Sequence, residues 1–211
     1  MEPGLWAELG ASPDAIARLE RFVGLVRQWT GRINLIAPST LSTIWSRHVE
    51  DSARIVLGAP GRPRLWADLG SGGGFPGIVV AILLADRGSG TRVVLVESDQ
   101  RKAALLEEAL RRLDTPGEVI AARAESIAPL GADVVSARAL APLDRLCALA
   151  ARHLAAGGRA LFPKGGNWQA EVDGAHRDWR FDLDVQPVPG HNAGVVLALE
   201  NLKRAREERD R

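Results

Sequence analysis

The 211-residue chain has one cysteine, one methionine and no tyrosine. Because Cys147 stands alone, an internal disulfide is excluded. The longest apolar run, residues 78–85, is far shorter than the roughly 20 residues that span a bilayer. The first residues, MEPGLWAELG, also lack the apolar core of a signal peptide. We therefore expect a soluble, cytoplasmic protein that makes no membrane contact.

The chain also lacks a charge excess, since 27 basic and 26 acidic residues leave a net charge of +1. Any nucleic-acid site must therefore be a local basic patch. With only four histidines and one cysteine, no metal-ligand cluster and no Ser/His/Asp or Cys/His arrangement is visible. We expect neither a metal nor a covalent nucleophile.

The first part of the chain has helical patterns only. Ser12-Pro13-Asp14 is typical of a helix start, and apolar residues follow it at helical spacing. A second helix is predicted from Ser39 or Thr40 to Leu57, before the Gly/Pro-rich stretch at 58–63. We predict that residues 1–60 form a helical extension packed on the core.

The pattern then changes to short apolar strands that alternate with helices. This alternation predicts a mostly parallel sheet with helices on both faces. Two final apolar segments joined through glycines predict a closing antiparallel hairpin. We expect a domain over 61–202 and a charged tail over 203–211. The predicted strands are 64–69, 91–97, 117–123, 132–137, 158–163, 181–189 and 194–202, and the predicted helices are 77–85, 99–113 and 143–154.

The run WADLGSGGGFPG, residues 66–77, lies between a predicted strand and a predicted helix. In this arrangement, backbone amides at the helix N-terminus are expected to face a ligand, and glycines let it approach closely. The run ends without the Gly-Lys-Ser/Thr of a P-loop, which excludes the simplest nucleotide triphosphatase. Residues 72–77 match G-x-G-x-x-G, whereas residues 68–74 match the D-x-G-x-G-x-G of S-adenosylmethionine-dependent methyltransferases.

Two acidic residues bear on the choice of cofactor. Asp68 would repel a pyrophosphate and attract the ammonium group of S-adenosylmethionine. Glu97 ends the next predicted strand and suits the ribose hydroxyls of either cofactor. A tight turn without a ligand is disfavoured, because so many glycines cost backbone entropy.

Several separated motifs make the resemblance more specific. The run DLGSGGGFPG occurs with NLIA at 34–37, RHVEDS at 47–52, SARALAPL at 136–143 and PKGG at 163–166. Together they resemble the RsmG (GidB) family, which methylates N7 of a guanine in 16S ribosomal RNA. The resemblance implies a Rossmann-like, class I methyltransferase fold, S-adenosylmethionine as cofactor, and 16S ribosomal RNA or a small-subunit assembly intermediate as partner.

The resemblance also assigns residues to the cofactor site. It implies that Gly70 and Phe75 contact the cofactor, that Gly72 and Gly74 shape the turn, that Ala124 and Glu125 flank the adenine, and that Arg138 completes the site. With Glu97, most of these residues follow predicted strands, where ligands bind in open α/β sheets. For Glu125 a helix cap, and for Arg138 a structural ion pair, are the alternatives.

On the acceptor side, the candidates for RNA contact are Asn34, Arg47, His48 and Lys164. His48 shares a helix face with Asp51 and Ser52, although a structural histidine fits equally well. Lys164 suits a phosphate contact or a solvated surface. We predict one basic patch from Arg47, Arg54, Arg62, Arg64, Arg138, Arg145 and Lys164.

Methylation of guanine N7 needs no general base, because this atom has a lone pair and no proton to lose; catalysis is expected from proximity and orientation. The alternatives are a methyltransferase with a small-molecule or protein acceptor, a nicotinamide-dependent oxidoreductase, and an RNA-binding module without activity. The turn His191-Asn192-Ala193-Gly194 departs from the family pattern, which expects an arginine there.

Overall fold

The computed structural model describes residues 2–189 and 194–205. Their strands form one sheet in the order β3-β2-β1-β4-β5-β7-β6. Neighbours from β3 to β5 pair in parallel, whereas β7 is antiparallel to both β5 and β6. The strands are β1 (Leu65–Leu69), β2 (Arg92–Val96), β3 (Glu118–Ile120), β4 (Ala132–Ser136), β5 (Leu154–Lys164), β6 (Trp179–Pro187) and β7 (Val195–Arg204).

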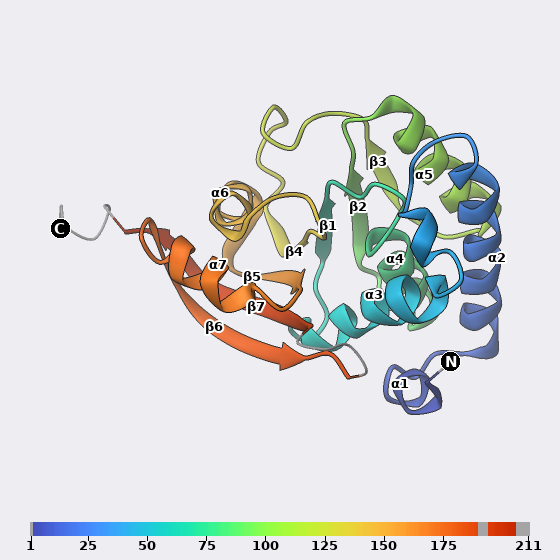
Figure 1. Ribbon diagram of the computed structural model, residues 1–211, viewed down its shortest axis with the longest axis horizontal. Helices are drawn as coiled ribbons and strands as arrows, with labels where there is room; N and C mark the ends of the chain where they lie inside the picture. Colours follow the sequence, from blue (N-terminus) through green and yellow to red (C-terminus); the bar gives the residue numbers. More distant parts are fainter. Residues whose placement is uncertain (1, 190–193, 206–211) are drawn as a thin grey trace.

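Helices cover both faces of this sheet (Figure 1). Successive residues of β1 point to opposite faces of the sheet: Trp66 belongs to the core cluster that includes α2, α3 and α4, and Ala67 belongs to the cluster that includes α6 and α7. The helical elements are α1 (Pro3–Glu8), α2 (Pro13–Thr30), η1 (Pro38–Thr40), η2 (Trp45–Glu50), α3 (Asp51–Arg54), η3 (Ile55–Gly58), α4 (Gly77–Asp86), α5 (Gln100–Arg112), α6 (Leu143–His153) and α7 (Trp168–Ala175).

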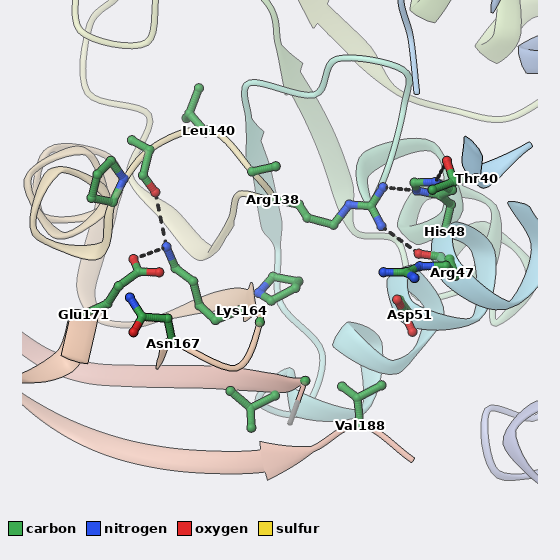
Figure 2. A pocket seen from close by; sticks show the side chains of 17 residues that line it. Thr40, Arg47, His48, Asp51, Arg138, Leu140, Lys164, Asn167, Glu171 and Val188 are labelled. Atoms are coloured by element: carbon green, nitrogen blue, oxygen red, sulfur yellow. Dashed lines mark hydrogen bonds and ion pairs between the residues drawn. The ribbon is translucent and has the colours of Figure 1, made fainter. Parts of the chain in front are cut away.

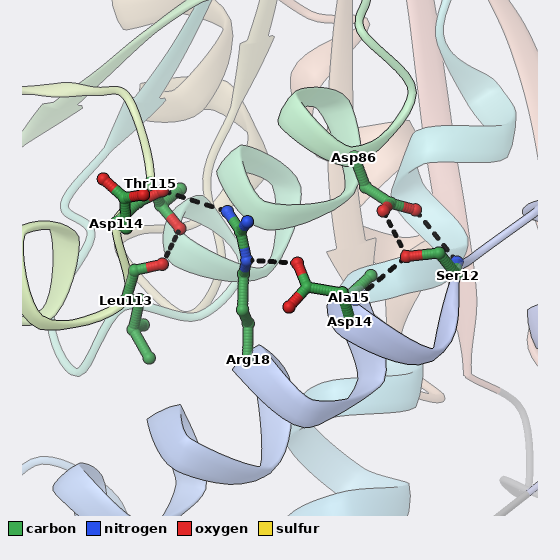
Figure 3. A network of polar contacts seen from close by, with 8 residues as sticks. All are labelled: Ser12, Asp14, Ala15, Arg18, Asp86, Leu113, Asp114 and Thr115. Carbon is green, nitrogen blue, oxygen red and sulfur yellow. Dashed lines mark hydrogen bonds and ion pairs between the residues drawn. The ribbon is translucent and has the colours of Figure 1, made fainter.

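The N-terminal helices share a core with the sheet. Phe22 of α2 is fully buried in the cluster that includes Trp66 of β1 and Ile78 of α4. Polar contacts fix the start of α2 on the domain, as Figure 3 shows: the Ser12 amide donates to Asp86 Oδ2 at 2.9 Å, and an Arg18 Nη donates to the Asp114 carbonyl at 2.9 Å. The extension is therefore an integral support for the glycine-rich loop, and the proposed boundary at residue 60 stays a prediction.

The predicted second helix is wrong as a single α-helix. The chain instead forms η1, a bend and turn at 41–43, the π-helical η2, one turn of α3 and η3. The hydroxyl of Thr40 donates to the Ala37 carbonyl at 2.8 Å, and that of Ser46 donates to Thr43 at 3.3 Å. Such side-chain bonds to the backbone compete with regular helix hydrogen bonds.

The closing hairpin is confirmed, because β6 and β7 pair from Trp179 with Arg204 to Pro187 with Val195. β7 continues to Arg204, two residues beyond residue 202, where the domain was predicted to end. The residues 190–193 of the atypical turn, and 206–211 of the tail, lie outside the described residues. Two helices, α1 and α7, were not predicted, because both are short and have weak apolar periodicity.

Candidate active site

The glycine-rich loop joins β1 to α4, and its backbone amides are largely used inside the protein. The amides of Gly70 and Ser71 donate to the Val96 carbonyl at 2.8 and 3.1 Å. The Gly72 amide donates to Glu97 Oε2 at 2.8 Å. These three loop amides are therefore not available to a ligand, because the Val96 carbonyl and the Glu97 carboxylate already accept their hydrogen bonds.

Asp68, in β1, stabilises the end of the glycine-rich loop through hydrogen bonds. Its side chain is fully buried, and its two oxygens accept from Ser136 Oγ at 2.7 Å and from the Gly77 amide at 3.1 Å. Burial raises the pKa of Asp68 to about 6, although these hydrogen bonds partly oppose that shift. The carboxylate thus caps the N-terminus of α4, and the predicted contact with a cofactor ammonium does not follow from this geometry.

The glycines of the loop have different roles. Gly70 adopts φ +67°, and a Cβ there would lie 2.6 Å from Leu140 Cδ1, so it permits a close approach at the surface of the site. Gly74 adopts φ +89°, and a Cβ there would lie 2.7 Å from the buried Phe22 ring. Gly74 therefore shapes the packing of the loop against α2, in keeping with the predicted turn-shaping role.

A small cavity of about 240 Å³ opens at the carboxyl ends of β1, β2 and β3. It brings together three of the residues that the resemblance assigns to the cofactor, Gly70, Ala124 and Glu125. Glu97 is 7% exposed beside it and accepts hydrogen bonds from the Gly72 and Asp99 amides, both at 2.8 Å. The assigned cofactor residues of the first three strand ends thus cluster, while their contacts with a cofactor stay predictions.

Sequence reasoning missed His153 and placed Arg145 in a basic patch, whereas both side chains support this cavity. His153 is fully buried at the end of α6, and its Nε2 lies 2.9 Å from the Ala124 carbonyl. Arg145 donates to Glu125 at 2.7 Å, and this hydrogen bond lowers the pKa of the Glu125 carboxyl. Both contacts link α6 to the loop after β3, and no local sequence pattern predicts them.

Arg138 lies between the strand ends and the N-terminal helices (Figure 2). Its guanidinium contacts His48 Nδ1, donates to the Arg47 carbonyl at 3.1 Å and lies 5.5 Å from the centre of the Phe75 ring. Because Nδ1 accepts, the Nε2–H of His48 donates to Thr40 Oγ1 at 2.9 Å. Burial, followed by the charges of Arg138 and Arg47, lowers the pKa of His48 to about 4. His48 is therefore a neutral partner of Arg138.

A second cavity, of about 1160 Å³, lies between these helices and the base of the hairpin. Figure 2 shows Arg47, His48 and Arg138 on one side and Lys164 on the other. Lys164 is mostly buried, and its ammonium donates to Glu171 Oε2 at 2.7 Å and to the Ala141 carbonyl at 3.2 Å. Lys164 thus anchors the segment after β4, and its contact with phosphate stays a prediction.

The predicted single basic patch is wrong. Arg64 immediately precedes β1, at the end of the sheet opposite the strand ends that form the site, and it donates to Asp133. Arg54 is mostly buried in an ion pair with Glu2. Asn34 is exposed and lines neither cavity. Local spacing could not reveal these positions, because they depend on where the chain enters the sheet.

Residues 15–195 match the family model described as rRNA small subunit methyltransferase G, GidB. The chain belongs to this family. It is 48% identical over 202 residues to ribosomal RNA small subunit methyltransferase G of Cereibacter sphaeroides (strain ATCC 17029 / ATH 2.4.9), covering 96% of this chain and 98% of that protein. The protein of the same name from Paramagnetospirillum magneticum is 43% identical over 204 residues, with 97% of both chains covered.

The resemblance to the RsmG family is therefore confirmed, and with it the prediction of an rRNA methyltransferase. Solved structures support the fold class. A protein from Pyrococcus horikoshii OT3 has a TM-score of 0.59 at 14% identity, covering 82% of this chain and 96% of that chain. M. jannaschii TYW2 in complex with AdoMet has a TM-score of 0.56 at 15% identity, covering 76% and 78%. At such identities the likeness concerns the fold alone.

No helix within 2–189 or 194–205 is long and apolar enough to cross a membrane. In the same part of the chain, no group of three or more His, Cys, Asp or Glu side chains is placed to hold a metal ion.

Proposed function

We propose that this member of the rRNA small subunit methyltransferase G family transfers a methyl group from S-adenosylmethionine to N7 of a guanine in 16S ribosomal RNA. The choice of cofactor depends on one observation, which is that two carboxylates outside the glycine-rich loop bind one of its backbone amides and the first amide of α4. The Glu97 carboxylate accepts the hydrogen bond of the Gly72 amide, and the Asp68 carboxylate accepts that of the Gly77 amide at the start of α4. Family membership supports the ribosomal RNA acceptor.

A dinucleotide is disfavoured by the same arrangement. Enzymes that bind dinucleotides place a pyrophosphate at the helix N-terminus, where free amides and the helix dipole favour negative charge. Here the carboxylate of Asp68 already caps that helix, and a second anion beside it would be repelled. S-adenosylmethionine has no phosphate and carries a positive sulfonium, so it does not need these amides.

The residues of the small cavity suit part of such a cofactor, because its volume of about 240 Å³ lies below the roughly 300–1000 Å³ of most small-molecule sites. Gly70, Val96 and the segment 122–125 line this cavity, with Leu140 packed beside Gly70. The Glu97 carboxylate has lone pairs left for ribose hydroxyls after accepting two amides. We assign cofactor binding to Gly70, Glu97, Ala124 and Glu125, with Phe75 and Arg138 contributing at the boundary with the larger cavity.

The larger cavity suits a macromolecular acceptor. Its volume of about 1160 Å³ exceeds the roughly 300–1000 Å³ typical of small-molecule sites. Arg47 is exposed at its edge, and the uncharged His48 keeps local positive charge on the arginines. We propose that Arg47 contacts the RNA backbone, where a cation contributes affinity without base specificity.

Bound S-adenosylmethionine supplies an electrophilic methyl carbon attached to a sulfonium. Guanine N7 would form a bond to the methyl carbon as the carbon–sulfur bond breaks, which would leave neutral S-adenosylhomocysteine and move the positive charge to the base. No proton would be released, so the chain need not provide a base. Its residues position the acceptor, because a near-attack geometry is worth orders of magnitude in rate. The bonding of Arg138 to Arg47, His48 and Phe75 fixes one wall of the acceptor cavity before substrate binds.

The test is transfer of labelled methyl from S-adenosylmethionine to ribosomal RNA isolated from cells that lack this protein, followed by mapping of N7-methylguanine. One modified guanine in 16S RNA is the expected result. Transfer to neither naked RNA nor small-subunit particles would contradict the proposal. Thermal shift separates the cofactors: S-adenosylmethionine at 100 times its Kd should add roughly 2.7 kcal/mol of stability, and NAD should add none.

A further inference from the structure

Leu140 lies at the boundary between the two cavities and lines both of them. It is 40% exposed, which is unusual for a large apolar side chain in this molecule. Its Cδ1 covers the bare Cα of Gly70, where a Cβ would lie only 2.6 Å away. The side chain thus separates the proposed cofactor cavity from the proposed acceptor cavity.

The segment that carries Leu140 is held on both sides. Upstream, Arg138 is bonded to Arg47 and His48. Downstream, the Ala141 carbonyl accepts from Lys164 at 3.2 Å, and the Leu143 amide donates to Glu171 Oε2 at 2.9 Å. These anchors fix the backbone on either side of Leu140 through groups on η2, β5 and α7.

The backbone between these anchors is unusual. Ala139 adopts φ +54°, a left-handed conformation that is strained for a non-glycine residue. In Figure 2, Arg138 points toward the N-terminal helices, whereas Leu140 points away from them. Strain of this kind persists where the surroundings over-determine it, and here it sets the direction of Leu140.

We propose that Leu140 is a positioning residue that packs on the acceptor base and sets its distance from the methyl donor, an inference that rests on the proposed function. A branched aliphatic side chain offers van der Waals contact to the face of a purine without competing for its hydrogen bonds. A displacement of 1 Å at a reacting centre costs on the order of a hundredfold in rate. Leu140 therefore acts on turnover more than on cofactor affinity.

The experiment compares Leu140→Ala with Leu140→Met and with Leu57→Ala. Leu57 is 39% exposed and lines neither cavity, so it controls for loss of an equally exposed leucine. We expect Leu140→Ala to lower kcat for ribosomal RNA at least tenfold and to change the Kd for S-adenosylmethionine less than threefold. Leu140→Met, which keeps an apolar side chain of similar volume, should stay within threefold of wild type, as should Leu57→Ala.

Three outcomes separate this inference from the proposed function. A Leu140→Ala variant as fast as wild type would overturn the inference alone. Weakened cofactor binding that accounts for the whole loss of activity would also overturn it, because Leu140 would then belong to the cofactor site. Wild-type protein that binds S-adenosylmethionine but methylates no ribosomal RNA would overturn the proposed function.

Discussion

Arg138 donates to Nδ1 of His48, so a residue at the end of β4 is bonded to the N-terminal extension across 90 positions of the sequence. The same guanidinium also donates to the Arg47 carbonyl and lies over the Phe75 ring. A planar fork of donors can satisfy these partners at once, which a lysine ammonium cannot do with the same geometry. This relationship couples the extension to the methyltransferase domain at the wall of the larger cavity.

The first prediction concerns Arg138→Lys. Loss of one hydrogen bond from a charged group is worth about 1.5–3 kcal/mol, so we expect kcat/KM for methyl transfer to fall at least tenfold. Arg159→Lys is the matched control, because Arg159, like Arg138, bridges a side chain and a backbone carbonyl, here those of Glu200 and Gly58, but lines neither cavity. Its kcat/KM should remain that of wild type. Equal activity of the two variants in steady-state assays would contradict the assignment of Arg138.

The second prediction is a pH dependence at His48. Its pKa in the folded protein is about 4, below the ordinary 6.5, because burial and then the charges of Arg138 and Arg47 disfavour the imidazolium. The unfolded chain therefore takes up the proton first as the pH falls. The stability linked to neutral His48 is present above pH 6.5 and is lost between about pH 6.5 and 4.

The measurement compares thermal unfolding of wild type and His48→Gln from pH 7.5 to 4.5. As the pH decreases, the Tm of wild type should fall more than the Tm of His48→Gln, because glutamine cannot be protonated in this range. Direct titration of the His48 ring by NMR provides the second readout. A midpoint near 6.5 in the folded protein would be incompatible with this environment.

The fold beyond residue 60 could be predicted because the spacing of hydrophobic residues and the positions of glycines are local signals in the sequence. The strand–loop–helix unit of β1 and α4 and the antiparallel pair β6 and β7 follow directly from them. The second helix failed because hydroxyls at 39–46 bond to the backbone, a competition that apolar spacing does not register. The short α7 was missed for lack of a clear period.

The site was predictable only in part. Family motifs and strand ends placed Gly70, Ala124 and Glu125 around one cavity. They did not predict that Glu97 accepts a hydrogen bond from the Gly72 amide, 25 residues away in the sequence. Nor did they predict the contact between the His153 ring and the Ala124 carbonyl. These contacts depend on how β2 and α6 pack beside the loops, which is a tertiary relationship without a local sequence signal.

The third prediction contrasts two glycines of the loop. Gly72 and Gly74 both have positive φ, +55° and +89°, but an alanine Cβ at Gly72 has its nearest neighbour at 3.7 Å. At Gly74 it would meet the Phe22 ring at 2.7 Å and Ile78 at 2.8 Å. Gly72→Ala should lower the free energy of unfolding by about 1 kcal/mol through backbone strain.

Gly74→Ala adds overpacking of the core against α2, so we expect it to lose about 2 kcal/mol more than Gly72→Ala. Chemical denaturation of both variants gives the comparison directly. Equal losses would mean that the α2 packing yields easily and that Gly74 is needed for its backbone conformation alone.

The fourth prediction weighs two ion pairs of equal length. Lys164 and Glu171 lie 2.7 Å apart with side chains 10% and 27% exposed, and Arg145 and Glu125 lie 2.7 Å apart with side chains 63% and 46% exposed. Double-mutant cycles with Lys164→Met and Glu171→Gln, and with Arg145→Met and Glu125→Gln, isolate the two coupling energies. We expect about 2 kcal/mol for the buried pair and less than about 1 kcal/mol for the exposed pair.

The difference arises because Lys164 and Glu171 each have a second partner inside the protein, the Ala141 carbonyl and the Leu143 amide. Breaking one partner leaves buried polar groups unsatisfied, whereas water solvates the groups of the exposed pair. Lys164→Met should also lower kcat, since it releases the segment that holds Leu140. A coupling below 0.5 kcal/mol for the buried pair, with unchanged kcat in Lys164→Met, would show that the segment is held by Arg138 alone.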